Sequence, residues 1–189
     1  MTGQARIAAL ICFALLMASG CETQQDKAKR RLKQGKFTFN LPDLEGNSVS
    51  NTDKRFENKV VLYDIWGTWC PPCRKMTPFL KQLHADYASQ GLVIVGIAME
   101  YADDGGRDPK DLVVNYVEDN QMDYLILYAG AAEQPTELTF DILPFIEFDG
   151  FPTSVVIARD GTVKAIREDF NADIGKRIEA QVRELLDSN

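Results

Sequence analysis

Two cysteines separated by two prolines, Cys70 and Cys73, constrain this chain more than any other feature. They follow an apolar run, residues 59–66, and open a stretch of helical periodicity, residues 71–89. The apolar run predicts a buried strand, so both thiols are expected where a strand ends and a helix begins. A helix N-terminus favours anions and can lower a cysteine pKa from about 8.5 to roughly 3.5–7.5. The spacing therefore predicts a reversible disulfide, with Cys70 as the exposed attacking thiol and Cys73 as the resolving thiol.

Two other interpretations of the cysteine pair are weaker. A structural zinc site needs four ligands, and the rest of the chain supplies only Cys12, Cys21 and His84. We expect no metal site, because the first two lie in a targeting segment. His84 is separately expected to face solvent, without a catalytic role. A permanently closed structural disulfide is the other alternative, but so tight a ring adds little stability through loop entropy.

The N-terminal segment, residues 1–20, has the pattern of a secretory signal peptide. Arg6 supplies a positive charge, and residues 7–18 form an apolar stretch too short to span a bilayer comfortably. The residues Ala18-Ser19-Gly20-Cys21 resemble a bacterial lipobox, which implies cleavage before Cys21 and acylation of its thiol. The alternative is a plain cleaved signal that leaves Cys21 as a free thiol. Either way, we expect an extracytoplasmic protein, lipid-anchored to a bacterial membrane and facing the periplasm in the first case.

The next segment, residues 21–36, is expected to be a tether. It is rich in lysine and arginine and poor in apolar residues, which is typical of a solvated linker; attraction to anionic lipid headgroups is the alternative. The whole chain of 189 residues carries a net charge of −7, which argues against nucleic acid as a partner. Glycine motifs for nucleotide binding are absent, so no cofactor is expected.

The remaining residues, 37–189, are expected to form one α/β domain. Strand and helix patterns alternate through the first part, which predicts a core of parallel strands joined by right-handed crossovers. A final hairpin around Arg159-Asp160-Gly161 makes the predicted sheet mixed. The expected strands are residues 37–41, 48–49, 59–66, 92–98, 124–128, 153–158 and 162–167, and the expected helices are residues 71–89, 108–120, 135–146 and 171–186.

Two motifs in this order resemble the TlpA/ResA-like branch of the thioredoxin superfamily. The first is the run from Val60 to Arg74 around the cysteines, with Pro78 after it, and the second is Gly150-Phe151-Pro152-Thr153-Ser154. Residues 37–50 also resemble the hairpin that opens this branch. The resemblance implies a thioredoxin-like α/β fold, with a mixed central sheet flanked by helices and an N-terminal β-hairpin.

The resemblance also implies a substrate-binding surface at Pro152, Phe151, Trp69 and Thr153. Pro152 would be a cis proline beside the cysteine pair, an isomer found in about 5–6% of X–Pro bonds. The backbone of Phe151 would then pair with an extended substrate segment. The alternative from the residues alone is an ordinary trans proline that opens a strand.

Asp64 is the third predicted catalytic residue, after Cys70 and Cys73. It interrupts the apolar strand, where a carboxylate is costly unless it is paired or protonated. The resemblance implies proton exchange with the inner cysteine, because thioredoxin has an aspartate at the matching position. ResA-like proteins use a glutamate three residues after the second cysteine, where this chain has Met76. Asp64 alone is therefore expected to accept the Cys73 proton; the alternative is a surface-edge aspartate without a role.

The resemblance implies a thiol-disulfide oxidoreductase that reduces disulfides in partner proteins, apocytochrome c being one route in the family. Electrons would come from a membrane donor of the DsbD or CcdA type. A disulfide oxidase or isomerase uses the same chemistry in a direction set by reduction potential. A thiol peroxidase of the peroxiredoxin type and a non-catalytic binding module are the alternatives from other classes.

Overall fold

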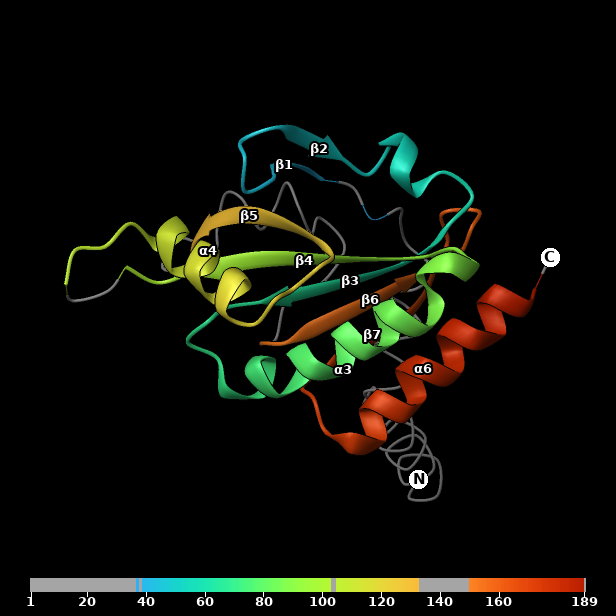
Figure 1. Ribbon diagram of the computed structural model, residues 1–189. Coiled ribbons are helices and arrows are strands. Elements are labelled where there is room, and N and C mark those ends of the chain that lie inside the picture. The colour runs from blue at the N-terminus through green and yellow to red at the C-terminus, as the bar shows by residue number, and fades with distance from the viewer. Residues whose placement is uncertain (1–36, 38, 103–104, 133–149, 189) are drawn as a thin grey trace, which may run out of the picture.

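The computed structural model describes residues 37, 39–102, 105–132 and 150–188, and its centre is a five-stranded sheet (Figure 1). The strand order is β5-β4-β3-β6-β7, and a separate two-stranded sheet pairs β1 with β2. The strands are β1 Asn40–Pro42, β2 Ser48–Ser50, β3 Val60–Trp66, β4 Leu92–Glu100, β5 Leu125–Ala131, β6 Thr153–Ile157 and β7 Val163–Glu168, and the helices are α3 Pro71–Tyr87, α4 Pro109–Asp119 and α6 Ala172–Asp187, with short 3-10 turns η1 Lys54–Phe56 and η2 Ala88–Gln90.

The sheet is mixed, as the sequence predicts. Strands β3, β4 and β5 run parallel and are connected through α3 and α4, whereas β6 pairs antiparallel with both β3 and β7. Strand β3 lies at the centre, and all seven of its residues are buried. The cysteine pair therefore follows a central strand whose residues are all buried.

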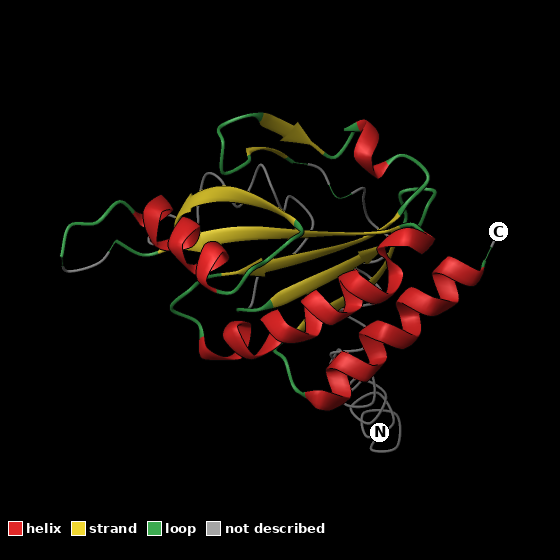
Figure 2. Cartoon of the chain, viewed as in Figure 1, coloured by secondary structure: helices red, strands yellow, loops and turns green. Residues whose placement is uncertain are grey.

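Helices cover one face of the sheet, which Figure 2 shows as red ribbons in front of the yellow strands. Leu80 of α3, Val113 of α4 and Ile178 of α6 belong to one buried cluster with residues of β3 and β4. The other face carries a second cluster, where Phe39 and Phe56 pack edge-on against Tyr63. Each face thus has its own apolar core, and the segment around β1, β2 and η1 contributes to the second one.

Polar residues at the helix starts explain where each helix begins. Asp108 caps α4 by accepting the Lys110 N–H, and Pro109 occupies the first helical position. Asn171 caps α6 in the same way, accepting two backbone N–H groups. The cap of α3 is Cys70 itself, whose side chain accepts the Cys73 N–H.

The predicted elements over the described residues are confirmed, with shifts at their ends. Strand β1 begins at Asn40 rather than residue 37, although Phe37 and Phe39 are both buried in the second cluster. Strand β4 continues two residues past the predicted end, to Glu100, and β5 ends at Ala131. The longer β4 matters because its last residues lie beside the redox motif.

Several predictions fall outside the described residues. The signal peptide, residues 1–20, the tether, residues 21–36, with its lipidation site Cys21, and the helix over 135–146 are among them. Within the part of the chain that the structure describes, no helix combines the length and apolar character needed to cross a bilayer.

Candidate active site

Cys70 and Cys73 form a disulfide at the N-terminus of α3. The two Cα atoms are 5.3 Å apart, and Cys70 Sγ accepts the Cys73 backbone N–H at 3.2 Å. The backbone of Cys70 is held on both sides, because its N–H donates to the Gly67 carbonyl and its carbonyl accepts the Arg74 N–H. The pair therefore sits where the sequence predicts, at the junction of the central strand and its helix.

The expectation of an exposed Cys70 is wrong for this disulfide-bonded form. Only 2% of Cys70 and 1% of Cys73 is accessible to solvent. The physical reason is that the Cys70 sulfur is bonded to Cys73 and directed at the first turn of the helix. The preceding residue, Trp69, is 36% exposed and presents the accessible surface beside the disulfide.

Three aromatic side chains from separate segments meet at this end of the sheet. The Trp69 ring lies 4.6 Å from Tyr101 and 4.8 Å from Phe151 between centroids, both edge-on. Its indole N–H donates to the Met99 carbonyl at 3.1 Å. We call Trp69, Tyr101 and Phe151 the aromatic cluster. The sequence predicted Trp69 and Phe151 as substrate-binding residues but gave Tyr101 no such role, although the carboxyl ends of parallel strands meet at one edge and so place the loop after β4 near the cysteine pair.

The loop before β6 contains the cis peptide bond that the family resemblance implied, between Phe151 and Pro152. The Pro152 carbonyl accepts the Asp169 N–H, and the Thr153 hydroxyl donates to the Gly150 carbonyl at 2.7 Å. Pro152 and Thr153 are buried, and the hydrogen bond of the Thr153 hydroxyl holds the loop in shape. Phe151 is only partly buried, so it is the most exposed of these three residues. The contact between Phe151 and Trp69 brings this loop against the redox motif.

Asp64 lies in the middle of β3, between Gly96 of β4 and Ser154 of β6, and is 3% exposed. Strand alternation places it on the face of Leu62 and Trp66, which α3 covers. Its Oδ1 atom has no hydrogen-bond partner among the described residues. Burial raises the pKa of Asp64 to about 7, because no neighbouring donor offsets the loss of water. The alternative of a surface-edge aspartate is therefore wrong.

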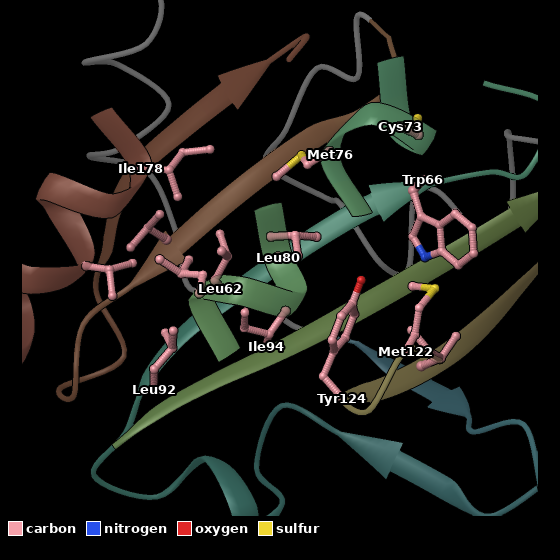
Figure 3. Close-up of a cluster of buried hydrophobic side chains, with 14 of the residues drawn as sticks. Leu62, Trp66, Cys73, Met76, Leu80, Leu92, Ile94, Met122, Tyr124 and Ile178 are labelled. Atoms are coloured by element: carbon pink, nitrogen blue, oxygen red, sulfur yellow. The ribbon is translucent and has the colours of Figure 1, made fainter. Parts of the chain in front are cut away.

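The space between α3 and the sheet is lined mainly by apolar side chains (Figure 3). Cys73 and Met76 project from α3 over Leu62 and Trp66 of β3. The Ser154 hydroxyl of β6 donates to the Met76 sulfur at 3.8 Å. Met76 is fully buried, and its thioether cannot exchange a proton. Asp64 is the carboxyl group that β3 places on the face covered by α3.

A second buried carboxylate, Glu100, was not predicted from the sequence. It ends β4, is 2% exposed, and accepts the Thr68 N–H at 2.9 Å and the Tyr101 N–H at 3.1 Å. The signal that could have found it is an acidic residue directly after an apolar strand, at the same sheet edge as the cysteines.

The remaining candidate ligands do not gather into a metal site. Among the described residues, no three His, Cys, Asp or Glu side chains cluster in a way that could hold a metal ion. The expectation of a solvent-facing His84 is wrong, because its ring lies 6.2 Å from Tyr124 and its Nδ1 atom is buried. The physical reason is that one side of the His84 ring packs towards Tyr124, which precedes β5.

Comparisons with known proteins agree with this geometry. A family model described as Redoxin matches residues 27–181. The chain belongs to the Redoxin family. It is 30% identical over 141 residues to the thiol-disulfide oxidoreductase ResA of Bacillus anthracis, covering 73% of this chain and 70% of that protein, and this makes it a ResA-like member.

A further relative and a solved structure extend this likeness. ResA of Bacillus thuringiensis subsp. konkukian is 30% identical over 128 residues, 66% of this chain and 62% of that relative, so the match spans somewhat less than two thirds of its length. The structure of a thiol:disulfide interchange protein of the thioredoxin family from Chlorobium tepidum superposes with a TM-score of 0.62 at 25% identity, covering 79% of this chain and 93% of that one. The fold is accordingly thioredoxin-like.

Proposed function

We propose that this protein is an extracytoplasmic thiol-disulfide oxidoreductase that reduces disulfides in partner proteins. The observation that carries the proposal is the Cys70–Cys73 disulfide at the N-terminus of α3, beside the loop with the cis Phe151–Pro152 bond. Membership of the Redoxin family and similarity to ResA support the same chemistry.

The reaction begins with the reduced dithiol. The Cys70 thiolate attacks one sulfur of the substrate disulfide, which forms a mixed disulfide and releases the first substrate thiolate. The Cys73 thiolate then attacks the Cys70 sulfur, which releases the second substrate thiolate and closes the Cys70–Cys73 bond. Two electrons pass from the enzyme dithiol to the substrate, and the enzyme ends in the disulfide form.

Asp64 accepts the proton that Cys73 must lose before it attacks. With a pKa raised to about 7 by burial, the Asp64 carboxyl exchanges protons near neutral pH, which suits a general base. An ordinary exposed aspartate, with a pKa of about 4, would be a much weaker base at the same pH.

The substrate binds over Trp69, Phe151 and Pro152, with Thr153 holding the shape of the loop. Trp69 and Phe151 are in ring contact, which joins the redox motif and the loop before β6 into one surface. An extended substrate segment pairs with the backbone of Phe151 while its disulfide faces Cys70.

Membrane attachment and recycling complete the proposal. Acylation of Cys21 anchors the protein, and residues 21–36 tether the domain to a bacterial membrane on its periplasmic side. A membrane dithiol donor of the DsbD or CcdA type reduces the enzyme again, since the chain has no nucleotide-binding motif of its own. Apocytochrome c is one substrate of this chemical kind.

Trapping with Cys73→Ala tests the proposal. Without its resolving thiol, the enzyme should stall as a mixed disulfide through Cys70, visible as a shifted band on non-reducing gels and released by dithiothreitol. The matched control is the double variant Cys70→Ala/Cys73→Ala, which should trap nothing. Absence of any dithiothreitol-sensitive adduct with Cys73→Ala, in cells and with a model protein disulfide, would contradict the proposed activity.

A further inference from the structure

Glu100 uses both oxygens of its carboxylate to hold backbone at the redox end of the sheet. Oε2 accepts the Thr68 N–H at 2.9 Å, and Oε1 accepts the Tyr101 N–H at 3.1 Å. The Glu100 backbone is itself fixed, because its carbonyl accepts the Ala132 N–H at 2.8 Å. The side chain is 2% exposed, so water does not compete for these bonds.

The Thr68 contact is part of a double tie between β4 and the segment that leads to Cys70. The residue after Thr68, Trp69, donates its indole N–H to the Met99 carbonyl. Two consecutive residues of β4 therefore hold two consecutive residues of the segment. The approach is close, because a Cβ atom on Gly67 would lie 2.5 Å from the Met99 carbonyl oxygen.

The Tyr101 contact fixes the other member of an exposed aromatic pair. Trp69 and Tyr101 are 36% and 39% exposed, and among the described residues they are the large hydrophobic side chains that solvent reaches most. Their rings are 4.6 Å apart, edge to face. One buried carboxylate thus binds the backbone of Tyr101 and of the residue before Trp69.

We propose that Glu100 is a positioning residue that holds the Trp69–Tyr101 pair as a docking surface for an apolar side chain beside the disulfide of a protein substrate. The inference rests on the proposed function and deepens it. Trp69 directly precedes Cys70, and Cys70 is almost fully buried whereas Trp69 and Tyr101 are exposed, so the aromatic pair offers a partner an accessible apolar surface next to the cysteine. A polypeptide has side chains that flank its disulfide and can occupy this surface, whereas a small aliphatic disulfide has none.

The test is substrate selectivity in Glu100→Gln. The amide keeps the size of the side chain, but its NH2 group donates, so one of the two backbone N–H groups loses its acceptor. The ratio of kcat/KM for insulin to kcat/KM for hydroxyethyl disulfide should fall about 10-fold, because a loosened surface affects only the substrate that docks on it. The matched control is Glu118→Gln, an exposed carboxylate on α4, which should keep the wild-type ratio.

Iodide quenching of tryptophan fluorescence gives an independent measurement. Trp66 is buried and Trp69 is exposed, so iodide reports on Trp69 without further substitution. Glu100→Gln should raise the iodide quenching constant. A second variant, Tyr101→Ala, leaves the Glu100 side chain intact. It should lower the ratio of kcat/KM for insulin to kcat/KM for hydroxyethyl disulfide, as Glu100→Gln does.

The outcomes separate this inference from the proposed function. A wild-type protein that reduces neither substrate would overturn the proposed function and this inference with it. An active wild type whose substrate ratio is unchanged in Glu100→Gln, or whose two substrates lose rate equally, would overturn this inference alone. Unchanged iodide quenching in Glu100→Gln would overturn it as well.

Discussion

Two buried carboxylates, Asp64 and Glu100, lie on neighbouring parallel strands and have opposite surroundings. Both are less than 4% exposed. Glu100 accepts backbone N–H groups at both oxygens, whereas Oδ1 of Asp64 has no partner among the described residues. Burial raises the pKa of Asp64 to about 7. At similar burial, Asp64 thus has a raised pKa and one oxygen without a partner, whereas both oxygens of Glu100 hold backbone N–H groups.

The difference follows from where each residue stands along its strand. Asp64 is in mid-strand, where the neighbouring amides serve the sheet ladder and the flanking Ser154 hydroxyl is directed at Met76. Glu100 is at the strand end, where the amides of Thr68 and Tyr101 are available to a side chain. The availability of backbone donors, rather than depth, decides what a buried carboxylate does.

The largest effect is expected from Asp64→Asn, which replaces the proposed proton acceptor by an amide. Resolution of the mixed disulfide by Cys73 should slow about 100-fold at pH 7. Stopped-flow detection of product release measures this rate, while iodoacetamide alkylation of Cys70 should change little. Unchanged resolution with an unchanged pH profile would contradict the role given to Asp64.

The pH dependence of stability should distinguish the same site. Folding raises the Asp64 pKa to about 7, from about 4 in an unfolded chain. Between these two pH values the Asp64 carboxyl is protonated in the folded protein and ionised in the unfolded chain. The folded protein is therefore most stable below about pH 4, and its stability decreases as the pH rises to 7. The free energy of unfolding should fall by about 1.4 kcal/mol per pH unit in that window. Urea titrations of the oxidised protein at pH 5 and pH 7 measure this fall, which should be absent from Asp64→Asn; parallel wild-type and variant curves would argue against it.

Two glycine substitutions compare the surroundings of the two carboxylates. A Cβ on Gly96, opposite Asp64, would lie 2.7 Å from Ile126 Cδ1, and one on Gly67 would lie 2.3 Å from Trp69 Nε1. Each alanine variant should lose about 1–3 kcal/mol of stability through overpacking. Only Gly67→Ala should also raise iodide quenching of Trp69, because only that contact lies in the region held by Glu100. Equal iodide quenching in Gly67→Ala and Gly96→Ala would contradict the expectation that only the Gly67 contact affects the region held by Glu100.

The smallest effect is expected from Thr77→Val, next to Cys73. The Thr77 hydroxyl donates to the Cys73 carbonyl and lies 3.3 Å from the Tyr116 hydroxyl. Its loss should cost about 1 kcal/mol of stability in thermal unfolding. Resolution by Cys73 should stay within about 2-fold of wild type, because a hydroxyl of this kind exchanges no proton at neutral pH. A large kinetic loss would show that proton transfer near Cys73 does not depend on Asp64 alone.

The sequence by itself determined the order of the elements and the place of the cysteine pair. The apolar run before Cys70, the capping pair Asp108-Pro109 and the turn at Arg159-Asp160-Gly161 are local signals, and each gave the element found there. The same holds for Asp64, because a charge inside an apolar run is visible without knowing its neighbours.

Only the tertiary structure decided which side chains share the end of the sheet. Tyr101 and Glu100 follow Trp69 by about thirty residues, and their contacts arise because β3 and β4 pair in parallel and bring their carboxyl ends together. The burial of Cys70 likewise depends on its disulfide with Cys73 and on the buried cluster to which both residues belong. Local sequence patterns fix the backbone conformation. Burial and hydrogen-bond partners, in contrast, depend on segments that are distant in sequence, because the register of the sheet brings those segments into contact.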